Sequence, residues 1–144
     1  MRGVSSLIFQ KPDKRNVFKQ IWRNICDSNR GLLIMFKESS TVQRLIPLEI
    51  VVGVVLGIIF GFIALEYIIM GAIIIMIFTT ETINSAIEEV NDLVTDQINE
   101  KVKRSKDMAS ASVWTWHLVY IICVLVFLVM HIAHFAWWAH IIPS

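Results

Sequence analysis

Three long apolar stretches constrain the fold of this chain more than any other feature of its sequence. The first runs from Ile46 to Leu65, the second from Tyr67 past Thr80, and the third from about Val113 to about Phe135. A helix needs about 20 predominantly apolar residues to cross the hydrocarbon core of a bilayer, and the stretches suit that length. The sequence therefore predicts an all-α integral membrane protein with three transmembrane helices.

Composition supports this fold class. Hydrophobic residues make up 56% of the 144 residues and charged residues only 17%, and the mean hydropathy is positive. A soluble domain usually carries about 25% charged residues, so that class is excluded. No long repeat or linker-like cluster divides the chain. We therefore expect a single membrane domain over residues 1–144, with helices at about 17–37, 46–65, 67–90 and 103–139, the last two with cytoplasmic extensions.

Charged and aromatic residues predict the orientation. The first 45 residues hold nine of the thirteen Lys and Arg side chains, and the tail after Phe135 holds none. Because loops rich in Lys and Arg stay in the cytoplasm, the amino end is expected inside and the carboxyl end outside. Tryptophans at both ends of the third stretch are typical of the membrane interfaces. Glu66 interrupts the apolar sequence, so we expect a tight reversal there at the far face of the membrane.

The segment before the first span has a basic amphipathic pattern. Between Val17 and Met35, apolar residues alternate with Lys19, Arg23 and Arg30. Such a helix lies on the membrane surface, with its apolar face in the acyl boundary and its cations toward anionic headgroups. The alternative is a cytosolic helix that binds a partner protein.

Glycine recurs at every fourth residue of the first span, at Gly53, Gly57 and Gly61. On a helix these positions share one face, so another helix can approach its backbone closely. The alternative is glycine that merely faces lipid.

The polar segment after the second stretch carries the candidate chemistry. Glu81 follows an uncharged run, and an acidic residue at the centre of a membrane helix costs about 2.5–3.5 kcal/mol, less near the interface, so a functional role is the default interpretation. At 3.6 residues per turn, one helix face carries Glu81, Asn84, Ser85, Glu88 and Asp92. Carboxylates on successive turns suit Mg²⁺, which is usually shared with substrate phosphates. One acid could instead act as a base, and for Glu88 and Asp92 the alternative is an ordinary exposed helix end.

Cations follow this stripe after a short loop. Lys103, Asp107 and Ser110 share a helix face, with Arg104 and Lys106 beside them. Positive charge next to an acidic stripe suits a nucleoside triphosphate, because charge stabilisation dominates the catalysis of phosphoryl transfer. The alternative is a cytoplasmic anchor of the third span. The chain has no Walker loop, kinase glycine loop or GxGxxG motif, so such a site would lie outside the common nucleotide-binding folds.

The motif ETINSAIEEVNDLV, followed after a short spacer by KRSKDMASASV, closely resembles the prokaryotic diacylglycerol kinase family of small three-span lipid kinases. The similarity extends from about Phe18 to the third span. The resemblance implies a homotrimeric bundle in the bacterial inner membrane, with active sites between subunits at the cytoplasmic face. It also implies that ATP and Mg²⁺ are used to phosphorylate a lipid alcohol.

The resemblance further implies roles for individual residues. Glu81 would be the general base on the lipid hydroxyl, Glu88 and Glu38 would hold the metal, and Lys106 and Asp107 would contact the nucleotide. The full expected set is Glu81 and Asn84 for catalysis, Glu38 and Glu88 for Mg²⁺, Lys19, Glu38, Glu88, Lys106 and Asp107 for ATP, and Glu81, Ser85 and Ser110 for the lipid.

A few positions depart from the family pattern. Gln20 stands where Arg is expected and Asp27 where an aromatic residue is expected, so Lys19 would replace the missing cation. The segment 31–38 is one residue shorter than expected, and Ala109 replaces a commoner Gly.

Other functions remain open at this point. Diacylglycerol is expected rather than undecaprenol, because KDMASAS is closer to the diacylglycerol branch of the family. The second class is an ion- or proton-conducting oligomer in which Glu81 titrates, although residues 46–64 and 68–78 offer almost no polar side chains to line a pore. A non-catalytic scaffold gives no reason for the acid at Glu81.

The outer end of the third span offers a further alternative. His131 and His134 are about one turn apart and His140 is near, which suggests a metal site, but no acid or Cys in this part of the sequence completes it. The expected partners of the chain are ATP, a lipid alcohol, the bilayer and further copies of itself, with no nucleic acid.

Overall fold

A computed structural model describes residues 17–94 and 99–141 of the chain. Within these ranges every element is helical, which confirms the all-α class. The elements are α1 (Val17–Glu38), the short π-helical segment η1 (Thr41–Leu45), α2 (Ile46–Phe60), α3 (Ala64–Val94) and α4 (Glu100–Ile141).

Three helical segments are long and apolar enough to cross a membrane: Thr41–Phe60, Ala64–Val94 and Glu100–Trp137. Large apolar side chains such as Ile58, Ile75 and Val129 are exposed on them. Hydrocarbon accommodates such a surface, whereas water disfavours it. The protein is therefore a multi-pass membrane protein with three spans, as the sequence predicts.

The chain divides between Lys37 and Glu38 into two compact units. The first contains α1 apart from its last residue. Phe18, Ile21 and Trp22 are exposed on α1, as is Arg23. This is the amphipathic helix that the sequence predicts, and its place on the membrane surface stays a prediction.

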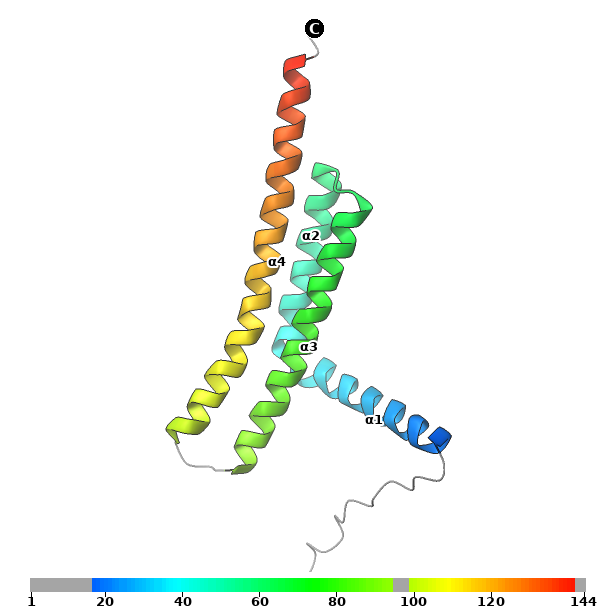
Figure 1. The fold of residues 1–144 in the computed structure, drawn as a ribbon, viewed down its shortest axis with the longest axis vertical. Helices are drawn as coiled ribbons and strands as arrows, with labels where there is room; N and C mark the ends of the chain where they lie inside the picture. Colours follow the sequence, from blue (N-terminus) through cyan, green and yellow to red (C-terminus); the bar gives the residue numbers. More distant parts are fainter. Residues whose placement is uncertain (1–16, 95–98, 142–144) are drawn as a thin grey trace, which may run out of the picture. The chain divides into compact units, whose positions relative to one another are not determined.

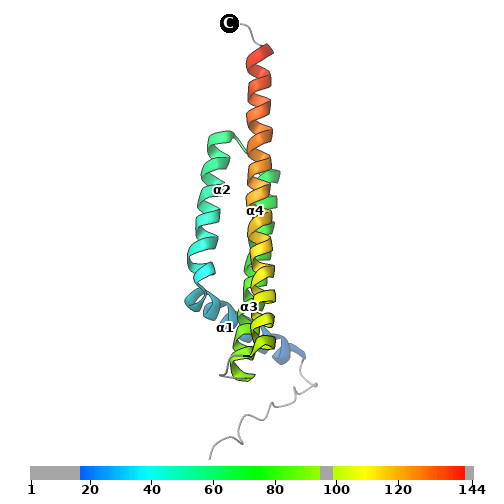
Figure 2. The same cartoon turned by 90° about the vertical axis from the view of Figure 1, so that its left-hand side faces the viewer.

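In the second unit α2, α3 and α4 pack together. α3 and α4 lie side by side, α2 contacts both, and the carboxyl-terminal part of α4 extends beyond the end of the α2–α3 hairpin (Figures 1 and 2). Met70, Ile73 and Ile77 of α3 are buried, as are Tyr120 and Val124 of α4. This core holds the second unit together, and the polar stripe of α3 begins one turn after Ile77, at Glu81.

The reversal between α2 and α3 lies at residues 61–63, not at Glu66 as predicted. Gly61 has a φ of 75°, the left-handed conformation that commonly ends a helix. Glu66 instead lies buried in the first turn of α3, where a carboxylate oxygen accepts a hydrogen bond from the Ile63 backbone N–H at 2.8 Å. A carboxylate at a helix start is favourable because backbone N–H groups there lack partners. As a result, α2 ends before the predicted Leu65 and α3 begins before the predicted Tyr67.

Two of the three spaced glycines serve close helix packing. A Cβ on Gly53 would overlap the Tyr120 hydroxyl of α4, and one on Gly57 would overlap the Tyr67 ring of α3. Gly61 has open space around it and ends the helix instead. The expectation of close approach is thus confirmed for Gly53 and Gly57 and wrong for Gly61.

Candidate active site

Glu81 is buried in α3 and held by a residue from a distant part of the chain. The Ser39 hydroxyl donates a hydrogen bond to Glu81 Oε1 at 2.7 Å, and the same hydroxyl oxygen accepts one from the Val42 backbone N–H at 3.2 Å. Because Ser39 lies between α1 and η1, this contact ties the start of the first span to the middle of α3. Sequence analysis missed Ser39, since nothing in its spacing links it to Glu81.

The predicted polar stripe on α3 changes from buried to exposed along the helix. Asn84 is buried, Ser85 and Glu88 are half-buried, and Asp92 is exposed. Asn84 Nδ2 donates a hydrogen bond to Glu88 Oε1 at 3.2 Å. Asn84 Oδ1 is buried without a hydrogen-bond partner in the described part of the chain. The stripe therefore presents oxygen atoms over several turns. Their burial decreases along α3, as expected for a helix that passes from a membrane into water.

The start of α4 lies against the exposed end of this stripe. Lys106 donates a short hydrogen bond to Asp92 and forms an ion pair with it. Asn91 Nδ2 donates to the Ser105 hydroxyl at 3.3 Å. Glu88 is also close enough to attract the Lys106 charge. The structure thus brings together the cation and the acid stripe that the sequence places on either side of a loop.

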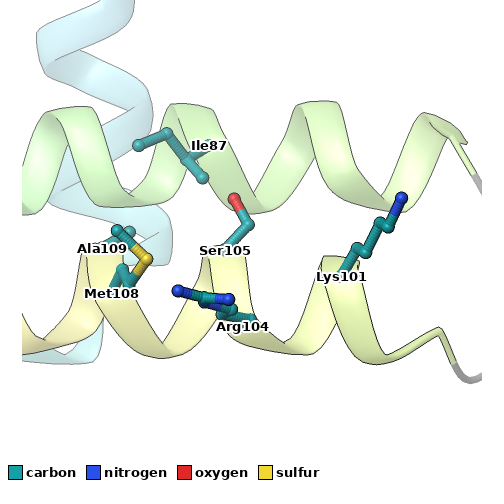
Figure 3. A pocket seen from close by; sticks show the side chains of 6 residues that line it. All are labelled: Ile87, Lys101, Arg104, Ser105, Met108 and Ala109. Carbon is teal, nitrogen blue, oxygen red and sulfur yellow. The ribbon is translucent and has the colours of Figure 1, made fainter.

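An open pocket of about 450 Å³ lies between α3 and α4 at this end. Figure 3 shows Ile87 on one helix facing a row of side chains on the other, with Ser105 and Lys101 reaching toward α3. The lining residues are Ile87, Lys101, Arg104, Ser105, Met108 and Ala109. Arg104 belongs to the cationic segment that the sequence predicts beside the stripe, whereas Lys101 was not among the predicted site residues, so its place in a pocket is new. Lys106 is not part of the lining.

The other predicted site residues are less closely connected. Glu38 is exposed and directly precedes Ser39, while Asp107 and Ser110 are exposed on α4. The described side chains make no hydrogen bond between Asp107 or Ser110 and the acids of α3. Lys19 belongs to the other compact unit, so its contact with ATP stays a prediction.

The donor atoms of the site suit Mg²⁺ without enclosing one. Within the described ranges, no group of three or more His, Cys, Asp and Glu side chains could hold a metal. Mg²⁺ in phosphoryl-transfer sites needs only one or two carboxylates, with phosphates and water completing its shell. Glu88, half-buried and bonded to Asn84 through one oxygen only, fits that requirement.

The carboxyl-terminal part of α4 holds a histidine whose partner differs from the metal site weighed as an alternative from the sequence. His131 Nε2 lies 2.9 Å from the nearer carboxylate oxygen of Glu66, so an acid distant in sequence is its partner. His140 lies outside the described side chains. Periodicity on one helix could not reveal Glu66, because that residue comes from α3.

Comparison with known proteins shows which family the chain belongs to. The family model of prokaryotic diacylglycerol kinase matches residues 27–141, which is most of the chain. The chain belongs to this family. A curated relative, the diacylglycerol kinase of Helicobacter pylori, is 28% identical over 107 residues, covering 72% of this chain and 80% of the relative. The protein is therefore a membrane lipid kinase, and the alternative classes of channel and scaffold are set aside.

Proposed function

We propose that this kinase transfers the terminal phosphoryl group of ATP to the hydroxyl of diacylglycerol, giving phosphatidic acid and ADP. The observation that carries the proposal is Glu81, a carboxylate buried in α3 directly after its uncharged run and held in place by Ser39. The relative from Helicobacter pylori is named a diacylglycerol kinase, which supports the choice of lipid. We also propose a homotrimer in the bacterial inner membrane, with the amino end in the cytoplasm.

Glu81 acts as the general base. Its carboxylate accepts the proton of the lipid hydroxyl while the hydroxyl oxygen attacks the terminal phosphorus, and the bond from that phosphorus to the bridging oxygen of ADP breaks. The Ser39 hydrogen bond fixes the position of the carboxylate. Asn84, one turn further along α3, orients Glu88 through its amide. Ser85 and Ser110 are the proposed contacts of the lipid.

The nucleotide binds at the exposed end of the stripe. Glu88 and Glu38 would hold Mg²⁺, which when bound neutralises charge on the phosphates. When the nucleotide binds, the Lys106 ammonium leaves Asp92 and contacts the phosphates. Asp107 contacts the nucleoside. Lys101 and Arg104, which line the pocket in Figure 3, add positive charge for the triphosphate.

Replacement of the base tests the proposal. In mixed micelles with diacylglycerol and ATP labelled at its terminal phosphate, Glu81→Gln is expected to lower the rate of lipid phosphorylation by at least about 100-fold, since general base catalysis contributes about 10² to 10⁴. Glu89→Gln is the matched control, because Glu89 is an exposed acid on the same helix, away from the stripe. Its rate should stay close to that of wild type, because the Glu89 carboxylate is exposed and belongs to none of the proposed binding or catalytic groups.

Three results would contradict parts of this assignment. Labelling of undecaprenol in place of diacylglycerol would correct the substrate. A Glu81→Gln variant that keeps its rate would show that another group is the base. Failure of the wild-type protein to label either lipid would reject the proposed activity.

A further inference from the structure

Two Glu–His pairs join α4 to the other spans, and they differ in how well their polar atoms are satisfied. In the Glu66–His131 pair, both carboxylate oxygens contact the imidazole, and one also accepts the Ile63 N–H. In the second pair, Glu49 Oε1 lies 2.7 Å from His117 Nδ1. Glu49 Oε2 and His117 Nε2 are buried and have no hydrogen-bond partner in the described part of the chain.

The Glu49–His117 pair lies in a tightly built contact. His117 is only 6% exposed, and the Tyr120 hydroxyl donates a hydrogen bond to the Glu49 backbone carbonyl at 2.6 Å. Gly53 leaves the space that the Tyr120 hydroxyl occupies. An unsatisfied buried polar atom is unfavourable, and more so where water is scarce. The protein leaves both atoms without partners, so a bound molecule that reached this pair would complete its hydrogen bonds.

An apolar groove of about 410 Å³ runs between α2 and α4 beside this pair. Glu49, His117 and Tyr120 line it together with aliphatic residues and Trp114. Its lining on α4 extends from Trp114 to Leu128, which at 1.5 Å per residue is about 20 Å. The polar residues lie toward one end of that length, and the remainder is apolar. The groove thus has the polarity of a lipid, with a small polar end and a long apolar part.

We propose that this groove binds a neutral lipid alcohol from the bilayer, with its hydroxyl at Glu49 and His117 and an acyl chain along the aliphatic wall. A hydroxyl suits both atoms, because its one O–H can donate to the carboxylate oxygen while its oxygen accepts a hydrogen bond from the second imidazole nitrogen when that nitrogen carries a proton. The phosphorylated lipid is excluded, since its negative charges would face the Glu49 carboxylate at low dielectric.

The groove contains none of the residues proposed for phosphoryl transfer. It is therefore a second lipid site that binds the substrate class and rejects the product class. Its role in supplying substrate rests on the proposed function, but binding of the alcohol does not require transfer.

Photolabelling in vesicles tests this site. The full-length protein in phosphatidylcholine vesicles is irradiated with a diacylglycerol that carries a diazirine on one acyl chain, and labelled peptides are mapped by mass spectrometry. We expect label on the groove faces of α2 and α4, displaced by unlabelled diacylglycerol and at least tenfold less effectively by phosphatidic acid.

A double variant isolates the polar pair. Glu49→Met with His117→Leu removes both charges together, a replacement that buried ion pairs often tolerate. It should lower groove labelling at least fivefold. Glu66→Met with His131→Leu is the matched control, because it removes the satisfied pair and should leave the labelling unchanged. Val52→Phe, which narrows the groove and keeps the pair, should also lower the labelling.

Several outcomes would overturn the proposal. They are label spread evenly over all three spans, equal displacement by phosphatidic acid, unchanged labelling in the Glu49 and His117 double variant, and no label in the groove, as when a second copy of the chain fills it. Groove labelling as expected without any lipid phosphorylation by wild type would instead reject the proposed function and leave the groove assignment standing.

Discussion

At the scale of single residues, the site combines one buried hydrogen bond with one exposed ion pair. The contact between Ser39 and Glu81 is buried, so it holds the carboxylate in one orientation. The pair between Lys106 and Asp92 is largely exposed, and exposed pairs contribute only about 0–1 kcal/mol. A triphosphate can therefore displace Asp92 from Lys106 at little cost, whereas Glu81 stays fixed.

Removal of the Ser39 hydroxyl should slow catalysis without weakening substrate binding. A hydrogen bond to a charged group contributes about 1.5–3 kcal/mol, so Ser39→Ala is expected to lower kcat roughly tenfold or more. Steady-state kinetics should show unchanged KM values for ATP and lipid, because Ser39 positions the base and contacts neither substrate. Ser39→Thr keeps the hydroxyl and should restore most of the rate.

Ser40→Ala is the control for this prediction, because Ser40 is the exposed neighbour of Ser39. An equal fall in both Ala variants, or a raised KM with unchanged kcat, would show that Ser39 does not position the base.

At the scale of the helices, small residues decide how the spans end and how closely they pack. Gly61 ends α2 in a left-handed conformation, and Glu66 satisfies a backbone N–H at the start of α3. Gly53 and Gly57 let the tyrosines of the neighbouring helices reach the backbone of α2. The packing of α2 thus depends on the absence of side chains at two positions.

Gly53→Ala should destabilise the fold by this mechanism. The added methyl group would push the Tyr120 hydroxyl from the Glu49 carbonyl, and overpacking of this kind costs about 1–3 kcal/mol. Thermal unfolding in detergent micelles, followed by circular dichroism, should show a lower midpoint. Gly71→Ala is the control, since a Cβ there meets no atom within 4 Å and alanine favours a helix. A midpoint equal to that of Gly71→Ala would contradict the proposed overlap.

At the scale of the whole molecule, the chain consists of two compact units, and residues expected to bind ATP occur in each. Lys19 belongs to the unit of α1, while Glu81, Glu88 and Lys106 belong to the unit of the three spans. A homotrimer with sites between subunits would let α1 of one copy serve the spans of another.

Mixed trimers test this assembly. Lys19→Ala and Glu81→Gln should each be inactive alone, because each damages every site. Equal mixing of the two, followed by reassembly from denaturant into micelles, should give about a quarter of wild-type activity if each site takes Lys19 and Glu81 independently from two copies of a symmetric oligomer. No recovery would place both residues of a site in one chain, and an active Lys19→Ala protein would remove Lys19 from the site.

Much of the fold and part of the site could be predicted because they depend on local pattern. Span number follows from the length of the apolar stretches, and the stripe from Glu81 to Asp92 follows from the helical period. The motifs ETINSAIEEVNDLV and KRSKDMASASV indicate the family by themselves, and the match over residues 27–141 confirms it. Local pattern did not locate the reversal, since the apolar sequence continues through it and only the backbone conformation of Gly61 shows where α2 ends.

The sequence by itself determined that this protein spans a membrane three times and carries an acidic stripe at the end of one span. Both features depend only on residues that are close together along the chain. Tertiary structure alone decided the partners of the buried polar groups. Ser39 and Glu81 are 42 positions apart, Glu66 and His131 are 65 apart, and Glu49 and His117 are 68 apart. Such pairs form only when packing brings helices side by side, and helical periodicity contains no information on which faces of different helices meet.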